Sequence, residues 1–181
     1  MVQAPTLMNA EQSTLVMIDV QERLMPAIAH GEEVIDRCLT LTTIAGLLGV
    51  PAVATEQLPD KLGHTVEDIR ELCEPVISKD HFDACPNGLI EQLPEDRKHI
   101  VIAGCETHVC MLQTALSLLD AGFTVWVVAD ATGSRNEFDR DVALDRLAQS
   151  GARIVTVEMV AFEWMRHSQH PNFRDIQKLI K

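Results

Sequence analysis

The chain has 181 residues, of which 46% are apolar and 23% are charged, and its formal net charge is −12 at pH 7. This length suits a single domain, and the balance of apolar and charged residues excludes intrinsic disorder. The acidic excess argues against nucleic acid and membrane surfaces as partners, because both require a basic face. We therefore expect one domain over residues 1–181, with residues 1–12 as an N-terminal extension.

The first residues and the cysteines indicate the cellular compartment. Residues 1–13 contain no basic side chain and no apolar stretch of signal-peptide length, so we expect a cytoplasmic protein. The five cysteines are odd in number and lack framework spacing, which indicates free thiols in a reducing compartment. Zinc is disfavoured because the chain has no Cys-x-x-Cys, and Cys105 and Cys110 stand five apart. We expect neither a metal nor a cofactor.

Short β-branched apolar runs alternate along the chain with longer amphipathic stretches. A short apolar run bounded by polar or turn residues predicts a buried strand. Six such strands are expected, over residues 14–19, 51–55, 76–79, 99–104, 123–129 and 153–157, the third being the weakest. Apolar residues at i, i+3 and i+4 spacing predict helices over 33–48, about 107–121 and about 137–149, and two short helices finish the chain.

Strands that alternate with helices indicate an α/β fold. Strands buried on both faces predict a mainly parallel sheet with helices on both sides, which is a three-layer, doubly wound, Rossmann-like arrangement. Right-handed crossovers favour the strand order 3-2-1-4-5-6. In such a sheet, ligands bind at the carboxyl ends of the strands where the winding direction reverses, between strands 1 and 4. Residues that follow strands 1 to 4 are therefore the candidates for function.

Three residues at these strand ends carry chemistry. Asp19 closes the first strand, Lys79 closes the third, and Cys110 lies in the first turn of the helix after the fourth. Each also has an ordinary interpretation: a turn or helix cap, a solvated lysine, and a buried packing cysteine. Together they form an activated-nucleophile arrangement, in which Thr107 caps the helix and the helix dipole lowers the pKa of the Cys110 thiol.

The segments around these residues resemble one family. Residues 15–21 (Leu-Val-Met-Ile-Asp-Val-Gln), Lys79 and residues 104–110 (Gly-Cys-Glu-Thr-His-Val-Cys) are similar to the isochorismatase-like cysteine hydrolase superfamily. The resemblance runs from about residue 10 to the end of the chain. It implies the isochorismatase fold, with a homo-oligomeric assembly.

The resemblance also implies a catalytic triad of Asp19, Lys79 and Cys110 and a two-step hydrolysis. Asp19 takes the thiol proton of Cys110, the thiolate attacks a carbonyl carbon, and water later cleaves the thioester. Lys79 keeps Asp19 ionised. The family further implies a cis peptide between Cys105 and Glu106, with the backbone N–H groups of Glu106 and Cys110 as an oxyanion hole.

Two differences from known members of the superfamily indicate which branch the sequence resembles. Nicotinamidases bind a metal through an Asp-x-His and a further His after the second strand, whereas residues 55–61 read Thr-Glu-Gln-Leu-Pro-Asp-Lys and only the distant His64 follows. The resemblance is therefore to the metal-independent, isochorismatase domain-containing branch. Cys110 favours cleavage of a small amide or related C–N bond, because protonation of the vinyl ether of isochorismate requires no thiolate.

Three other functions remain open at this point. The chain could hydrolyse an isochorismate-like vinyl ether, act as a non-catalytic homo-oligomeric binding or scaffold protein, or serve as a thiol redox protein that uses Cys105 and Cys110. The redox alternative is the weakest, because the two cysteines lack Cys-x-x-Cys geometry.

Position along the chain suggests contacts with a small-molecule substrate at Gln21, Glu56, Phe82 and His108. Each is equally well explained as a solvated loop residue or by packing. Residues 160–165 (Val-Ala-Phe-Glu-Trp-Met) form an aromatic-rich segment that either a second copy of the chain or the domain's own sheet would cover.

Overall fold

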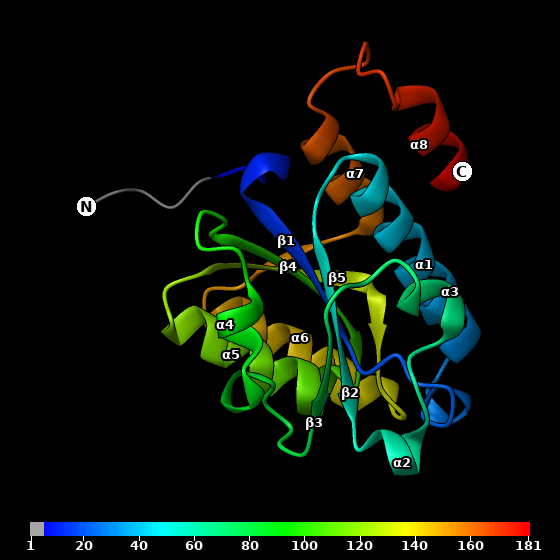
Figure 1. Cartoon of the computed structure of the whole chain (residues 1–181), viewed down its shortest axis with the longest axis vertical. Coiled ribbons are helices and arrows are strands. Elements are labelled where there is room, and N and C mark those ends of the chain that lie inside the picture. Colours follow the sequence, from blue (N-terminus) through cyan, green and yellow to red (C-terminus); the bar gives the residue numbers. More distant parts are fainter. Residues whose placement is uncertain (1–5) are drawn as a thin grey trace.

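Six parallel strands form a single sheet in the computed structural model, which describes residues 6–181 (Figure 1). Their order is β3-β2-β1-β4-β5-β6, as the crossover argument predicts. The strands are β1 (Ser13–Ile18), β2 (Ala52–Gln57), β3 (Val76–Lys79), β4 (His99–Cys105), β5 (Thr124–Gly133) and β6 (Arg153–Val155). All five neighbouring pairs are parallel, so the doubly wound α/β fold is confirmed.

Three strands are longer at their carboxyl ends than the apolar runs predict, β4 by one residue and β2 and β5 by more. β2 continues to Gln57, because Glu56 and Gln57 pair with β3 although neither is apolar. β5 continues to Gly133 through an irregularity in its pairing with β4, where the register shifts between Ile102 and Gly104. Polar residues at these strand ends therefore belong to the sheet rather than to the loops that follow.

The main helices connect the strands and cover the sheet. They are α1 (Gly31–Leu47), α5 (Leu112–Asp120), α6 (Glu137–Gln149), α7 (Val157–Met165) and α8 (Phe173–Leu179). Short helices of four residues each, α2 (Pro59–Leu62), α3 (Glu67–Arg70) and α4 (Leu89–Gln92), lie in the connections around β2, β3 and β4. The structure also contains three single 3-10 turns: η1 (Ala10–Gln12), η2 (Met25–Ala27) and η3 (Cys85–Asn87).

The helix predicted over about 107–121 differs from the prediction at its start. Its first turn, η4 (Thr107–Met111), is π-helical, and α5 begins only at Leu112. Thr107 is not the N-cap, because Glu106 occupies that position and the Thr107 hydroxyl lies 2.9 Å from the hydroxyl of Thr132. The wide turn places Cys110 inside the first helical turn after β4.

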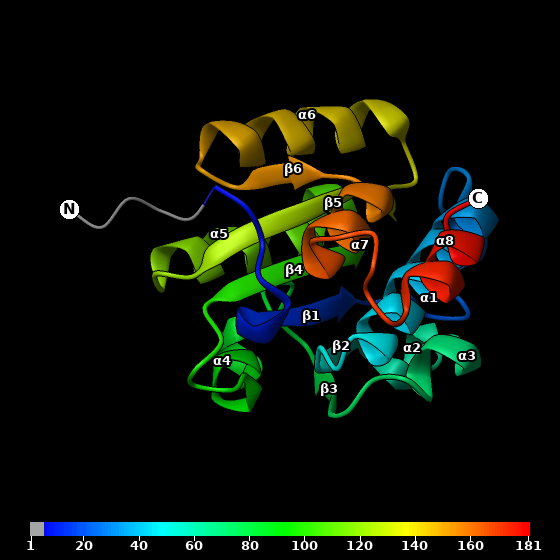
Figure 2. The same cartoon turned by 90° about the horizontal axis from the view of Figure 1, so that it is seen from above.

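Two apolar clusters fill the space on either side of the sheet (Figure 2). One lies under α1, α3, α7 and α8, and the other under α4, α5 and α6. Alternate residues of β1 enter different clusters, Leu15 and Met17 on one face and Val16 and Ile18 on the other. This alternation is the pattern that a central strand of a three-layer fold requires.

Gly104 allows β4 to approach β1 closely beside Asp19. Its φ angle is +111°, and a Cβ atom at this position would lie 2.0 Å from the carbonyl oxygen of Ile18. No L-residue with a side chain fits this position without displacing the backbone. The glycine therefore fixes the spacing of the two strands at whose ends the candidate residues lie.

The aromatic-rich segment at residues 160–165 packs largely on the domain itself. Trp164 is buried in α7, and its indole Nε1 donates to the hydroxyl of Ser13 at 3.1 Å. Phe162 and Met159 on the same helix remain partly exposed. The domain's own sheet thus covers Trp164, and only the outer side of α7 is left for a partner.

The described part of the N-terminal extension is attached to the same side of the fold. Met8 is buried, and its backbone N–H donates to the carboxylate of Glu163 at 2.8 Å. Residues 1–5 of the predicted extension lie outside the described residues. Over residues 6–181, helices long and apolar enough to cross a bilayer are absent.

Candidate active site

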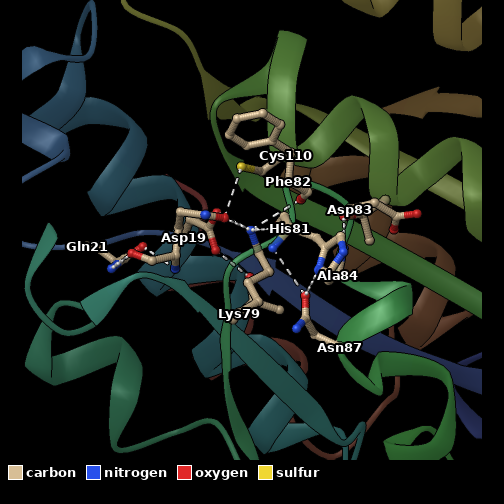
Figure 3. A network of polar contacts seen from close by, with 12 residues as sticks. Asp19, Gln21, Lys79, His81, Phe82, Asp83, Ala84, Asn87 and Cys110 are labelled. Atoms are coloured by element: carbon tan, nitrogen blue, oxygen red, sulfur yellow. Dashed lines mark hydrogen bonds and ion pairs between the residues drawn. The ribbon is translucent and has the colours of Figure 1, made fainter. Parts of the chain in front are cut away.

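Asp19 is the first residue after β1 and is fully buried. Its carboxylate accepts two hydrogen bonds, from the hydroxyl of Thr55 on Oδ1 at 2.6 Å and from Nζ of Lys79 on Oδ2 at 2.8 Å. Its φ angle of +47° turns the chain sharply at the end of the strand. Figure 3 shows the Asp19, Lys79 and Cys110 side chains pointing toward one another.

Lys79 ends β3, and its side chain is completely inaccessible to solvent. Besides Asp19, its ammonium donates to Oε1 of Gln57 at 2.6 Å and to the carbonyl oxygens of His81 and Phe82, each at 3.2 Å. A buried ion pair is stable only when such hydrogen bonds satisfy the remaining polar atoms. The predicted Asp19–Lys79 pair is therefore a fully bonded unit, and the ammonium has no N–H left to offer a ligand.

Cys110 lies in η4 with its sulfur 3.9 Å from Oε1 of Gln57. Burial raises the pKa of its thiol to about 12, the Asp19 carboxylate adds to this rise, and the Lys79 ammonium opposes it. The prediction that the helix dipole lowers this pKa is wrong. Desolvation and a neighbouring negative charge raise the thiol pKa by more than the partial charge of the helix end lowers it. The effect of a helix end is largest where its free N–H groups face the anion.

The peptide bond between Cys105 and Glu106 is cis, as the resemblance implies. The Glu106 carboxylate accepts from the backbone N–H of Arg135 at 2.9 Å and from its Nε at 3.0 and 3.1 Å. His108 adds a second connection, because its Nδ1 lies 2.8 Å from the hydroxyl of Ser134. The side chains of Glu106 and His108 thus bind η4 to the segment after β5, and this segment orients the turn that carries Cys110.

Two predicted substrate contacts lie within the scaffold. Gln21 is buried, and its amide binds both backbone polar groups of Gln57 and the carbonyl of Gly63. Glu56 points to the opposite face of β2 from Gln57, where its carboxylate accepts from the N–H and hydroxyl of Thr65. Both side chains hold the segments after β1 and β2 together, so neither is available for a substrate.

Phe82 lies nearer to the reactive groups. Its carbonyl accepts from Lys79, and its side chain is 54% exposed. The partly exposed ring therefore belongs to the loop that follows the buried lysine. Cys85 lies further along the same loop, where burial raises the pKa of its thiol to about 12.

Gln57 and Thr55 are site residues that the sequence did not reveal. Both side chains contact the Asp19–Lys79 pair, and they lie two residues apart on the same face of β2. The apolar run predicted that β2 ends at residue 55, and this placed Gln57 in a loop. Pairing with β3 extends β2 to Gln57. Had this strand end been predicted, Gln57 would have been a candidate, because site residues lie at the carboxyl ends of neighbouring strands.

A hollow of about 500 Å³ lies beside Lys79 at the ends of β2 and β3. Its volume is in the range of pockets that bind small molecules. Its walls are apolar at two residues and polar or charged at the others: Leu58, Pro59, Asp60, Lys61, Ser78, Lys79, Asp80 and Asn87.

The fold and site define an α/β protein whose candidate catalytic side chains gather at the carboxyl edge of a doubly wound sheet. The sequence model of the isochorismatase domain matches residues 13–159, and the chain belongs to this family. It is 39% identical over 173 residues to isochorismatase domain-containing protein 2A of Mus musculus, a match that covers 94% of this chain and 84% of the mouse protein.

Solved structures show the same fold. A structure described as the MAR1 ribonuclease of Caenorhabditis elegans superposes with a TM-score of 0.90 at 35% identity, covering 97% of this chain and 92% of that one. The YcaC gene product of Escherichia coli, described as an octameric hydrolase of unknown specificity, gives a TM-score of 0.88 at 25% identity, covering 98% and 97%. Membership of this family supports a hydrolase-like role for the chain.

Proposed function

We propose that the protein is a cysteine hydrolase that cleaves a small amide or related C–N bond through a thioester. One observation carries this proposal: Asp19, Lys79 and Cys110 come from the ends of three strands and meet in one buried cluster. A thiol beside a carboxylate whose charge is compensated by an ammonium has the elements of nucleophilic catalysis.

The first half of the reaction forms the thioester. Asp19 accepts the thiol proton of Cys110 as the sulfur attacks the carbonyl carbon and a C–S bond forms. Backbone N–H groups of Glu106 and Cys110 stabilise the oxyanion, a type of contact worth roughly 3–4 kcal/mol per donor. The C–N bond then breaks, and the protonated Asp19 returns its proton to the leaving nitrogen.

The second half releases the acid. Water gives a proton to Asp19 and attacks the thioester carbonyl, the C–S bond breaks, and the proton passes to the Cys110 sulfur. The balance is one amide and one water consumed, and one carboxylic acid and one amine or ammonia produced. Lys79 compensates the charge of Asp19 whenever the carboxylate is ionised.

The proposed substrate is a small molecule whose carbonyl carbon reaches the Cys110 sulfur. The hollow of about 500 Å³ at the ends of β2 and β3 lies nearby, but neither Asp19 nor Cys110 lines it. A net charge of −12 opposes the binding of RNA, although one structural neighbour is described as a ribonuclease. We further propose that the protein is a homo-oligomer, which the octameric assembly of the Escherichia coli neighbour supports.

An ammonia-release screen over small amides, ureides and carbamoyl compounds tests the proposed reaction. We expect at least one compound to be hydrolysed by the wild type and by Cys73→Ala, a matched control that removes a thiol from the opposite apolar cluster. Cys110→Ala should fold normally and release no ammonia. Turnover of only a vinyl ether, or only of RNA, would contradict the proposal, as would wild-type turnover by Cys110→Ala.

A further inference from the structure

The side-chain oxygen of Gln57 contacts both Lys79 and Cys110. Nζ of Lys79 donates to this oxygen at 2.6 Å, and the Cys110 sulfur lies 3.9 Å from it. Gln57 is buried, so bulk water does not compete for the contact. An amide oxygen only accepts hydrogen bonds, so the thiol is the donor in this contact.

Neighbouring groups fix the orientation of Gln57. Gln21 Oε1 accepts from the Gln57 backbone N–H at 2.8 Å, and Gln21 Nε2 donates to the Gln57 carbonyl at 3.0 Å. The Gln57 side-chain nitrogen donates to the carbonyl of Asp80 at 2.9 Å. Exchange of the amide oxygen and nitrogen would bring two donors together at Lys79, so the oxygen stays on the side of the ammonium and the thiol.

The N–H groups of Lys79 are bound by other acceptors while Gln57 is in place. Its N–H groups go to Asp19, to Gln57 and to the carbonyls of the following loop. We propose that Gln57 is a positioning residue that keeps Cys110 protonated and unreactive in the empty site. It does so by accepting a hydrogen bond from the thiol and by occupying one N–H of the lysine.

This inference rests on the proposed function, in which Cys110 is the nucleophile, and adds to it the control of when the thiol reacts. A substrate that displaces the Gln57 oxygen would release one N–H of Lys79 toward the sulfur and remove the acceptor of the thiol's hydrogen bond. Both changes favour the thiolate. The site thus becomes nucleophilic when occupied and stays inert when empty.

The rate of Cys110 alkylation by iodoacetamide between about pH 7 and pH 9.5, followed by peptide mass spectrometry, tests this role. The alkylation rate is proportional to the fraction of Cys110 present as thiolate. A lower thiol pKa therefore raises the rate by the same factor at every pH in this range. Gln57→Met keeps the length of the side chain and removes the oxygen, and we expect roughly tenfold faster alkylation. Gln57→Glu places a carboxylate against the sulfur, and we expect slower alkylation.

Controls separate this effect from loosening of the fold. Gln149→Met, the same substitution on the exposed surface of α6, should alkylate like the wild type. The buried Cys38 reports on local opening within every variant. The proposal is supported if Cys110 is alkylated faster in Gln57→Met and slower in Gln57→Glu, while the alkylation rate of Cys38 is unchanged in both. Equal Cys110 rates in Gln57→Met and the wild type, or faster rates in both Gln57 variants, would overturn it.

The proposed function and this inference fail in distinguishable ways. If Cys110→Ala retains wild-type turnover, Cys110 is not the nucleophile, and both are overturned. If Cys110→Ala is inactive but Gln57→Met alkylates at the wild-type rate, the proposed function stands and the inference alone is wrong.

Discussion

Lys79 donates all of its N–H groups inside the protein, so its charge stabilises the site without reaching the substrate. This saturation has a thermodynamic consequence, because the pair that Lys79 forms with Asp19 is completely buried. Removing one member of a buried pair leaves an uncompensated charge, which costs more than the pair itself contributes.

Lys79→Met should lower the free energy of unfolding by about 3–5 kcal/mol, measured by urea denaturation at neutral pH. Asp19→Asn combined with Lys79→Met removes both charges and should recover most of this loss while remaining inactive. A double variant as unstable as Lys79→Met would show that the pair does not act as a charge-compensated unit.

His99 at the start of β4 should make stability depend on pH. Burial, assisted by Arg153 and Arg166, lowers the pKa of His99 below its usual value of 6.5. The unfolded chain then binds more protons than the folded one below pH 6.5, so the free energy of unfolding falls as the pH falls through this range.

The free energy of unfolding should fall by at most about 1.4 kcal/mol per pH unit, and His99→Gln should remove this pH dependence. Urea denaturation of both proteins between about pH 7 and pH 5 measures the difference. Parallel pH profiles for the wild type and His99→Gln would contradict the assignment.

At the scale of single residues, the sequence predicted the candidate catalytic side chains but not the residues that contact and orient them. Asp19, Lys79 and Cys110 were predicted because polar side chains follow apolar strands at one edge of the sheet. Gln57 was missed because its role depends on a strand pairing that no apolar pattern signals. The direction of the Cys110 pKa shift depends on burial, which local helix geometry does not determine.

Among the elements, β4 and β1 are held at a spacing that only Gly104 permits. Gly104→Ala combines a φ angle of +111° with a Cβ atom 2.0 Å from the Ile18 carbonyl oxygen, and we expect a loss of at least about 4 kcal/mol in the free energy of unfolding.

Gly122 provides a matched control. Its φ angle is +88°, but a Cβ there would meet nothing within 4 Å, so Gly122→Ala should cost only about 1–2 kcal/mol. Thermal unfolding of both variants gives the comparison. Similar losses in the two would mean that backbone conformation alone, and not the close approach of the strands, determines the effect.

The alternation of apolar runs and amphipathic stretches predicted every strand of the described sheet, and the preference for right-handed crossovers predicted their order. The short helices α2, α3 and α4 were not predicted, since four residues are too few to show helical periodicity. The π-helical turn at Thr107–Met111 escaped prediction because it depends on tertiary contacts, such as the one between Thr107 and Thr132.

The whole molecule should assemble in solution. Size-exclusion chromatography with light scattering should give a mass that is a multiple of the 20.1 kDa protomer, because several apolar side chains, among them Phe138 and Phe162, are exposed in the isolated chain. A single species of 20.1 kDa at micromolar concentration would contradict the proposed homo-oligomer.

The central claim is that Cys110 carries an acyl group during turnover. Acid quenching of the wild type while it hydrolyses an amide identified by the ammonia-release screen, followed by peptide mass spectrometry, measures this directly. The account predicts the acyl mass on the peptide that contains Cys110 and on none of the other four cysteines. An acyl group on another residue, or undiminished turnover by Cys110→Ala, would contradict it.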